Sequence, residues 1–428
     1  MKLKRNLLIS IFALIIMLLS RTSFAQGTTV SSPINANPLP VGSGARALGQ
    51  GGAFIAVADD ATASSWNPGG LAQLERPELS IVGSFLSTHQ DYDAGSTIWA
   101  LGNESVSRGD LNYASIACPF RVFEKNLVAA LNYQQIYDFH MDLDFDVKPI
   151  RSGQNIDFES KGGIGALTPA ISMRVTPKLS VGVAVNFYTD EFFGNYAWKE
   201  NYSSTVNAAF LENIDTTFKN FQAINITAGL LWHIWEKEDK HLTFGAVYDT
   251  PYTADVDRII DFTHAGQDPS HFREHFEIDF PMSFGAGLGF RYSDALSFSM
   301  DVTWTDWSEY MQEDEQGGKS RPLGAAPEGT EIDDTYTARF GTEYLMFGQK
   351  MIIPVRAGLF YDPRPSLDDP TDVYGFSVGS GITFKRFSLD GAYQFRWAND
   401  VDGEDFGLDG THFDLTEHMF LASVIVYF

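Results

Sequence analysis

The sequence alternates between apolar and small or polar residues in segments of about ten residues, and this pattern restricts the fold more than any other feature. From Leu296 to Thr305 every second residue is large and apolar, and the residues between are Ser, Asp or Thr. The same period of two recurs at 179–187 and 374–384. Successive side chains of a strand point to opposite faces, so the pattern predicts strands with one apolar face, each long enough to cross a bilayer when tilted. A soluble sandwich also alternates, so the period alone leaves both fold classes open.

The connections between the alternating segments decide between these classes. Every second connection is short, such as 293–294 and 348–349, whereas the intervening ones are long and acidic, such as 307–333 and 398–416. Short turns at one end and long loops at the other are typical of outer-membrane barrels and have no counterpart in a sandwich. We therefore expect an all-β membrane protein with fourteen antiparallel strands. They are predicted at 78–88, 111–120, 126–138, 162–175, 179–190, 221–234, 241–250, 280–292, 295–306, 335–347, 350–361, 374–384, 386–397 and 417–428.

The N-terminal residues predict export. Basic residues precede an apolar run from Leu7 to Leu19, and Ala25 provides a small residue for cleavage, so 1–25 is interpreted as a secretory signal peptide. The run is shorter than the roughly 20 apolar residues of a spanning helix. No second long apolar segment follows. Because only helices and closed sheets satisfy their backbone hydrogen bonds in lipid, a membrane protein with this sequence must be a barrel.

Composition excludes further classes of function. The 55 acidic residues outnumber the 30 basic ones, and the net charge of −25 repels nucleic-acid phosphates. The single cysteine, Cys118, can form neither an internal disulfide nor a zinc cluster. The sequence lacks a His-Glu-x-x-His pair and a phosphate-binding loop. We expect no enzyme activity, no metal and no cofactor.

The segment 42–76 contains the only long stretch after the leader that does not alternate. Its glycines permit tight turns and close approach to neighbouring backbone, and Asp59 and Asp60 can accept hydrogen bonds from local amides. Asn67 and Pro68 begin a rigid turn, which is either a gate that shifts as cargo passes or the connection to the first strand. We interpret the segment as a plug, or hatch, inside the barrel. The expected hatch and gate residues are Gly44, Arg46, Gly49, Gly51, Gly52, Asp59, Asp60, Asn67, Pro68 and Gly69.

Two motifs in this order resemble a known family, the FadL family of outer-membrane transporters for long-chain fatty acids and hydrocarbons. The family's hatch carries Ser-Gly, an Arg, a Gly-rich step, Ala-Asp-Asp and Asn-Pro-Ala. The pattern falls here on Ser43-Gly44, Arg46, Gly49 to Gly52, Ala58-Asp59-Asp60 and Asn67-Pro68-Gly69, with Gly69 in place of Ala. The second motif, 281–308, is similar to the family's hairpin that ends in Trp-Thr-Asp-Trp-Ser.

The resemblance implies a fourteen-stranded barrel plugged by a hatch. It further implies that hydrophobic cargo is caught by the outer loops, passed to an apolar lumen pocket and released through a gap in the wall. We expect outer-membrane lipid and lipopolysaccharide as surroundings, and a monomer. The terminal Phe428 resembles the signal that the barrel-assembly machinery recognises. The family's hatch begins close to the mature N-terminus, whereas 26–41 precedes it here.

Six charged residues occupy strand positions whose side chains point into the barrel according to the two-residue alternation. Either Arg339 or Arg356 pairs with a fatty-acid carboxylate, or the arginines neutralise Asp301 and Glu343 or hold acids of the hatch. Unpaired charge in a semi-dry lumen is costly, which favours the structural interpretation. The six residues are Asp301, Arg339, Glu343, Arg356, Asp390 and Arg396.

Aromatic residues occur in predicted outer loops, where solvated loops usually avoid them. They form a first groove for apolar cargo, a belt at the lipid boundary, or the core of a folded loop, and the sequence leaves these alternatives open. The residues are Tyr92, Trp99, Phe192, Phe193, Tyr196 and Trp198.

The sequence thus predicts a signal peptide at 1–25, a tail at 26–41, a hatch at 42–76 and a transmembrane barrel at 77–428. The function that the resemblance implies is transport of hydrophobic compounds, long-chain fatty acids first. The alternative is a FadL-like barrel that acts as a docking or shuttle component of a protein secretion system. A continuous apolar pocket joined to a wall opening favours transport, and a lumen filled with charged side chains favours docking.

Overall fold

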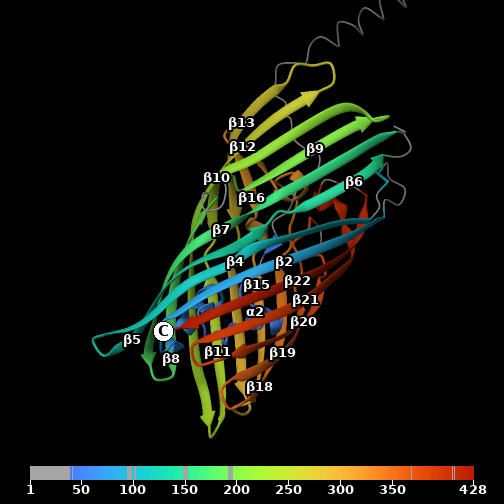
Figure 1. The fold of residues 1–428 in the computed structure, drawn as a ribbon. Helices are drawn as coiled ribbons and strands as arrows, with labels where there is room; N and C mark the ends of the chain where they lie inside the picture. Colours follow the sequence, from blue (N-terminus) through green and yellow to red (C-terminus); the bar gives the residue numbers. More distant parts are fainter. Residues whose placement is uncertain are drawn as a thin grey trace, which may run out of the picture. The chain divides into compact units, whose positions relative to one another are not determined.

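The structure, a computed structural model, describes residues 39–40, 42–93, 99–100, 103–147, 153–190, 196–367, 369–406, 408 and 410–428. The predicted signal peptide and most of the predicted tail lie outside these residues. The described chain is almost entirely β-structure, and its strands follow one another around a closed sheet (Figure 1).

Fourteen long strands form a closed antiparallel barrel, which confirms the predicted fold class. Each barrel strand pairs with the next, and β2 pairs with β22 from Glu78 opposite Tyr427 to Asp93 opposite His412, so the sheet has no free edge. The fourteen strands are β2 (Glu78–Asp93), β4 (Asn103–Val122), β5 (Lys125–Asp138), β7 (Gln154–Thr176), β8 (Leu179–Thr189), β10 (Ala209–Lys237), β11 (Lys240–Asp249), β14 (Ser283–Arg291), β15 (Leu296–Thr305), β18 (Thr335–Phe347), β19 (Ile352–Tyr361), β20 (Tyr374–Thr383), β21 (Phe387–Asp402) and β22 (His412–Tyr427). Each predicted strand range overlaps one of them, although β4, β7 and β10 extend well beyond the predicted ranges.

Several connections that we predicted as loops are strands, and that part of the prediction is wrong. β7 has 23 residues and β10 has 29, and their outer halves pair with strands from these connections. The added strands also alternate, as Met-Asp-Leu-Asp-Phe-Asp-Val at 141–147 shows. They were missed because we set the length of each predicted strand by the thickness of the bilayer, whereas the sheet continues beyond the bilayer on the outer side. The further strands are β1 (Leu39–Pro40), β3 (Trp99–Ala100), β6 (Met141–Val147), β9 (Trp198–Val206), β12 (Tyr252–His264), β13 (Ser270–Phe280), β16 (Met311–Asp314) and β17 (Lys319–Ser320).

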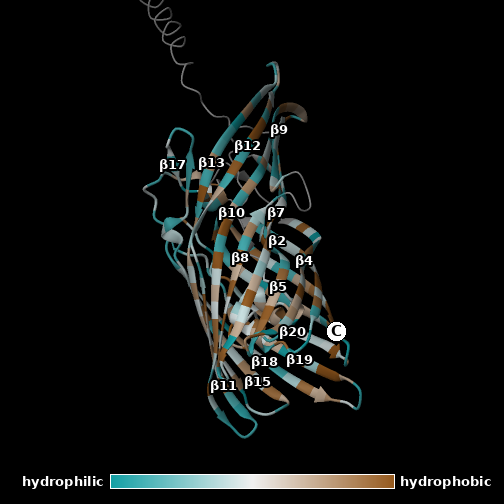
Figure 2. Cartoon of the chain, turned by 90° about the vertical axis from the view of Figure 1, so that its left-hand side faces the viewer, coloured by the Kyte–Doolittle hydropathy of each residue, from teal (hydrophilic) through white to brown (hydrophobic). Residues whose placement is uncertain are grey.

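The outward face of the barrel exposes large apolar side chains between two belts of aromatic residues. Figure 2 shows hydrophobic and hydrophilic residues alternating along the strands. The inner belt consists of exposed aromatic residues at the inner ends of strands, among them Phe120, Tyr292, Phe347 and Phe387. On β21, Trp397 of the outer belt lies ten residues from Phe387. About ten residues of tilted strand cross the hydrocarbon of a bilayer. The outer belt consists of two cross-strand rows offset by two residues at β18. One row is Tyr248, Phe284, Trp304 and Tyr336, and the other is Tyr361, Tyr374 and Trp397.

The helical elements are short, and among the described residues no helix has the length and apolar character needed to span a membrane. Three of them belong to the segment Gly42–Arg76, which we call the glycine-rich segment: α2 (Ala45–Gly49), α3 (Ala63–Trp66) and η1 (Pro68–Gln73). The outer connections contain η2 (Trp307–Glu309), η3 (Leu323–Ala325) and η4 (Gly403–Phe406).

Candidate functional site: the barrel lumen and a seam in its wall

The glycine-rich segment packs against the inward faces of the barrel strands, and its glycines make the close approach possible. A Cβ on Gly358 of β19 would lie 2.2 Å from the amide nitrogen of Gly51, and one on Gly70 would lie 2.0 Å from the Ala58 carbonyl oxygen. Gly44, Gly51 and Gly52 have positive φ angles. Side chains at these positions would clash or strain the backbone, so the segment depends on glycine here.

Hydrogen bonds connect the segment to strands around the whole wall. Donors and acceptors come from β22, β20, β15, β10, β7 and β4, which places the segment inside the closed sheet. The contacts are Ala45 N to Ser423 Oγ (2.8 Å), Gly51 N to Ser377 Oγ (2.8 Å), Ile55 N to Asp301 Oδ2 (2.8 Å), Asn67 Nδ2 to Leu230 O (2.8 Å), Arg174 Nη2 to Ala72 O (3.1 Å) and Tyr113 Oη to Ala61 O (2.6 Å).

Asn67 and Pro68 join the segment to the wall rather than only to the next strand. The Asn67 side chain accepts a hydrogen bond from Gly69 N (3.0 Å) and so caps η1, whose first residue is Pro68. The same side chain donates to Ile55 O and Leu230 O, both at 2.8 Å. This buried amide therefore fixes the turn, the segment and β10 to one another. Whether the turn also moves as a gate stays a prediction.

The predicted inward charges form two buried or half-buried networks. In the first, Arg356 contacts Glu343 (2.6 Å) and Asp390 (2.5 Å) on neighbouring strands. Arg46 of the glycine-rich segment contacts Glu343 at 3.3 Å and also pairs with Asp59, with Asp60 at 3.5 Å. Arg356 thus holds two wall acids, whereas the segment acids Asp59 and Asp60 are held by Arg46 of the segment itself.

The second network lies around Arg339 and Arg396. Both contact Asp362, at 3.2 and 2.7 Å, and Arg396 is 3.8 Å from Glu417. Arg364 contacts Glu417 at 2.7 Å. Arg339 also lies 5.9 Å from the Trp66 ring centroid. The sixth predicted charge, Asp301, accepts the Ile55 amide instead of an arginine.

Three members of the second network were not among the predicted sites. Asp362 and Arg364 follow β19 in a connection, where the period of two gives no inward or outward assignment. Glu417 lies on β22 with the parity of the buried residues Leu415 and Met419, so alternation could have identified it.

The outer part of the lumen is filled by an aromatic cluster that includes one of the predicted loop aromatics. Trp198 is buried on β9, and its ring stacks on Phe139 (4.3 Å between centroids) and Phe218 (4.0 Å). Tyr252 stacks on Phe280 at 4.8 Å in the same cluster. Trp198 is therefore in the core of a folded outer region and not in a solvated loop.

Of the other five predicted aromatics, the structure describes the side chain of Tyr196. Tyr196 is half-buried, with the Lys199 Nζ 4.3 Å from its ring centroid. Tyr92 belongs to β2 and Trp99 to β3, so neither is in a loop, which corrects that prediction. Phe192 and Phe193 lie outside the described residues.

The wall has a seam between β4 and β5, which the sequence analysis did not anticipate. Their ladder ends at Tyr113 opposite Gln134, although β4 continues along β2 and β5 continues along β7. We call the outer parts of the two strands, 103–112 and 135–138, the seam. At the outer end of β5, Leu39 and Pro40 of β1 pair with this strand.

Both strands carry an extra residue where the seam begins. Asn112 is the unpaired residue of the register shift between β4 and β2, and Ile136 that between β5 and β7. The buried Asn112 side chain donates to Gly42 O at 2.9 Å and accepts from Gly44 N at 3.4 Å. Bulges redirect side chains and end pairing. The bulge in β4 thus ties the start of the glycine-rich segment to the seam.

Charged side chains occupy the seam. Arg108 forms an ion pair with Asp138 and contacts Asp110 at 3.0 Å, and the Asp138 side chain is only 1% exposed. His140 Nδ1 lies 2.8 Å from Asp138 Oδ1. On the lumen side a cavity of about 30 Å³ adjoins these groups. It is lined by Thr88, Gln90, Val106, Phe139, His140, Met141, Arg364, Phe406, Leu415 and Glu417.

A closed fourteen-stranded barrel with an apolar outer face between aromatic belts defines a β-barrel protein of the outer membrane of Gram-negative bacteria. Over residues 22–416 the chain matches the family described as Outer membrane protein transport protein (OMPP1/FadL/TodX). The chain belongs to this family, as its sequence motifs predict.

Solved structures of related barrels have the same fold. A FadL homologue of Pseudomonas aeruginosa is 14% identical, with a TM-score of 0.58 over 92% of this chain and 99% of that one. The Pseudomonas putida toluene transporter TodX is 11% identical (TM-score 0.56, 93% of this chain, 97% of that one). The Ralstonia pickettii toluene transporter TbuX is 14% identical (TM-score 0.55, 90% of this chain, 98% of that one).

Comparison with curated proteins gives no match. In the part of the chain that the structure describes, no three His, Cys, Asp or Glu side chains gather as ligands for a metal ion.

Proposed function

We propose that this protein transports hydrophobic compounds across the outer membrane, with long-chain fatty acids as the cargo. The cargo enters through the outer aromatic cluster, passes the glycine-rich segment acting as a hatch, and leaves sideways through the seam into the bilayer. The observation that carries the proposal is the interrupted β4–β5 ladder, because a wall whose strands are already unpaired can admit a solute without breaking a continuous sheet.

Three features of the described residues support this route. The aromatic cluster offers an apolar surface at the outer end of the lumen. The seam is covered by β1, which in the described part of the chain makes two cross-strand pairs with β5, so few backbone hydrogen bonds oppose its displacement. Removing an acyl chain from water is favourable by about 0.8 kcal/mol per buried methylene, which suits an apolar path past the polar surface of the outer membrane.

The charge networks assign no ligand carboxylate to Arg339 or Arg356. Both arginines already contact wall acids, and Arg356 is buried between two of them. Displacing either acid would leave an unpaired charge in the lumen. We propose that these residues hold the wall and the segment, and that the cargo is recognised mainly by its apolar part.

The seam can be tested by locking β1 to β5. Pro40 and Tyr137 are cross-strand partners, so Pro40→Cys with Tyr137→Cys, in a Cys118→Ser background, places two thiols within disulfide reach. We expect oxidation to abolish uptake of radiolabelled oleate by cells, and reduction to restore it. The matched control is Gly391→Cys with Ala422→Cys, a pair on β21 and β22, where oxidation should leave uptake unchanged.

Full uptake by the oxidised seam variant would contradict the lateral route but not transport itself. Absence of oleate uptake by the unmodified protein, with toluene uptake intact, would instead assign an aromatic hydrocarbon as cargo.

The alternative, a docking component of a secretion system, is favoured by one observation. The lumen around the glycine-rich segment carries two networks of charged side chains, which is the arrangement expected of a plugged support rather than an apolar conduit. A strain lacking the protein that keeps normal uptake of oleate and toluene but loses secretion of a protein would establish this role.

A further inference from the structure

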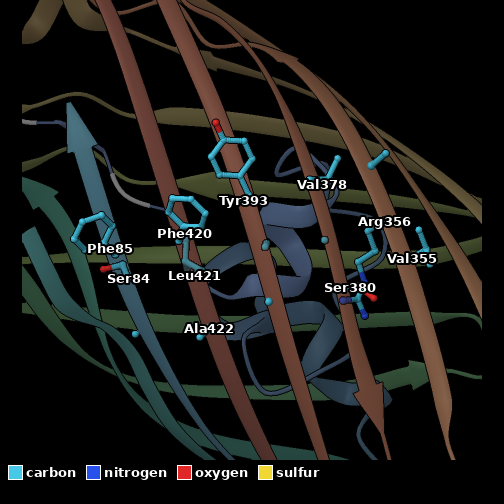
Figure 3. Close-up of a pocket in the computed structure, with 15 residues that line it drawn as sticks. Ser84, Phe85, Val355, Arg356, Val378, Ser380, Tyr393, Phe420, Leu421 and Ala422 are labelled. Carbon is cyan, nitrogen blue, oxygen red and sulfur yellow. The ribbon is translucent and has the colours of Figure 1, made fainter. Parts of the chain in front are cut away.

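The outer face of the barrel carries a groove of about 930 Å³ across β19, β20, β21, β22 and β2 (Figure 3). Its outward-facing lining residues belong to the apolar surface between the aromatic belts, so the groove faces the membrane and not the lumen. In Figure 3 the glycine-rich segment lies behind these strands. The groove has no role in the route through the seam.

A row of small residues in strict register forms the floor of the groove. Gly83 of β2 lies opposite Ala422 of β22, Ala422 opposite Gly391 of β21, and Gly391 opposite Ser380 of β20. A Cβ added to Gly391 would meet no atom within 4 Å. Four strands at their usual spacing span roughly 14 Å. The row is therefore a trough that crosses the strands.

Large side chains border the floor on both sides. Towards the outer belt, Phe420 lies beside Tyr393 (4.8 Å between ring centroids) and beside Phe85 (6.4 Å). Figure 3 shows these three rings and the Val378 side chain on one side of the floor residues Ala422 and Ser380. The row on the other side has the same register and consists of Ile81, Val424, Leu389 and Ile382. The trough is thus long, narrow and apolar.

The level of the groove determines what can fill it. On β21, Gly391 lies between Phe387 of the inner belt and Trp397 of the outer belt. Aromatic belts mark the headgroup levels, so the floor lies at the depth of hydrocarbon. A headgroup or a soluble partner does not reach this depth, whereas an acyl chain does.

We propose that the groove holds one acyl chain of a lipid resident in the outer membrane. Lipid tails are as apolar as the groove, so the hydrophobic effect contributes nothing, and the attraction comes from packing. An unfilled trough would lose dispersion contacts along its floor and both sides, and an extended chain restores them. A branched or ring-shaped solute fits a narrow trough less closely than a linear chain.

The proposal is tested with proteoliposomes of phosphatidylethanolamine that contain a trace of phosphatidylethanolamine with a diazirine in the middle of one acyl chain. After illumination, peptide mass spectrometry locates the labelled residues. We expect label to concentrate on β21 and β22 around the groove. Ala422→Leu, which fills the floor, should lower this label several-fold. Ala338→Leu is the matched control, because Ala338 is also exposed on the outer face but belongs to β18 outside the groove.

Two results would overturn the proposal. One is label spread evenly over the outward faces of all strands, or unchanged in Ala422→Leu. The other is a dimer in native mass spectrometry that Ala422→Leu dissociates, since a second copy would then be the occupant. Oleate uptake by the same preparations keeps the two proposals separate, because its loss bears on transport and not on the groove.

Discussion

The wall differs on the two sides of β2. On one side the β4–β5 ladder ends early, two strands bulge, and buried charges occupy the seam. On the other side β2 pairs with β22 along its whole length, although the outer face there carries the smallest side chains. The seam therefore results from interrupted strand pairing, whereas small side chains on continuously paired strands produce only a trough on the outer surface.

The largest expected effect is in the seam. Arg108→Ala removes the arginine partner of Asp138, which is 1% exposed, and leaves it the contact with His140 at 2.8 Å. Breaking one half of a buried pair costs about 3–5 kcal/mol, so urea unfolding in lipid vesicles should shift to much lower denaturant. Arg108→Ala combined with Asp138→Asn removes the stranded charge and should recover part of the loss. Equal stability of the single variant and the unmodified protein would show that the pair does not hold the seam.

A smaller effect is expected where the wall meets the glycine-rich segment. Gly358→Ala places a Cβ 2.2 Å from a backbone nitrogen of this segment, and such overpacking costs about 1–3 kcal/mol. Gly391→Ala in the groove is the same substitution in open space and should change the free energy of unfolding little. Limited proteolysis of 42–76 distinguishes the two variants. Identical protection would mean that the segment does not touch this part of the wall.

The smallest effect concerns the outer connection next to β21 and β22. Burial raises the pKa of Asp405 to about 6. The hydrogen bonds that its carboxyl group accepts from Leu367 N and Ser366 Oγ lower the pKa, but by less than burial raises it. Because folding raises this pKa, the protonated Asp405 carboxyl stabilises the folded state. This contribution is complete below pH about 4 and is lost as the pH rises through 6. Hydrogen exchange at the Leu367 amide, corrected for its intrinsic rate, should quicken over this interval. Asp405→Asn keeps an acceptor and should abolish the dependence, and a persisting dependence would point to another group.

Alternation and turn length were sufficient to predict the fourteen strands, because burial against lipid imposes one apolar face on each. The same parity indicated the six lumen charges, which lie buried or half-buried. Their partners were harder to foresee. Asp362 and Arg364 lie in a connection whose path depends on contacts across the lumen, and no local pattern in the sequence specifies them.

The seam could not be predicted for a different reason. A bulge such as the one at Asn112 inserts one residue, so the positions that face inward change from odd to even, or the reverse, beyond it. The sequence still alternates on both sides of the insertion, and the bulge therefore leaves no clear signal. The end of the β4–β5 ladder likewise changes no side-chain pattern. The outer strands alternate too, but the bilayer sets no limit on how far a sheet continues into solvent.

The pairing of β2 with β22 has a consequence for assembly. The wall closes only when the last residues of the chain reach the first strand, with Phe428 N bonded to Pro77 O at 3.0 Å. By then residues 42–76 have wall strands around them. Threading them afterwards through a finished cylinder would require breaking their contacts one by one. We therefore expect residues 42–76 to take their place before β2 and β22 pair, so that the barrel closes around them.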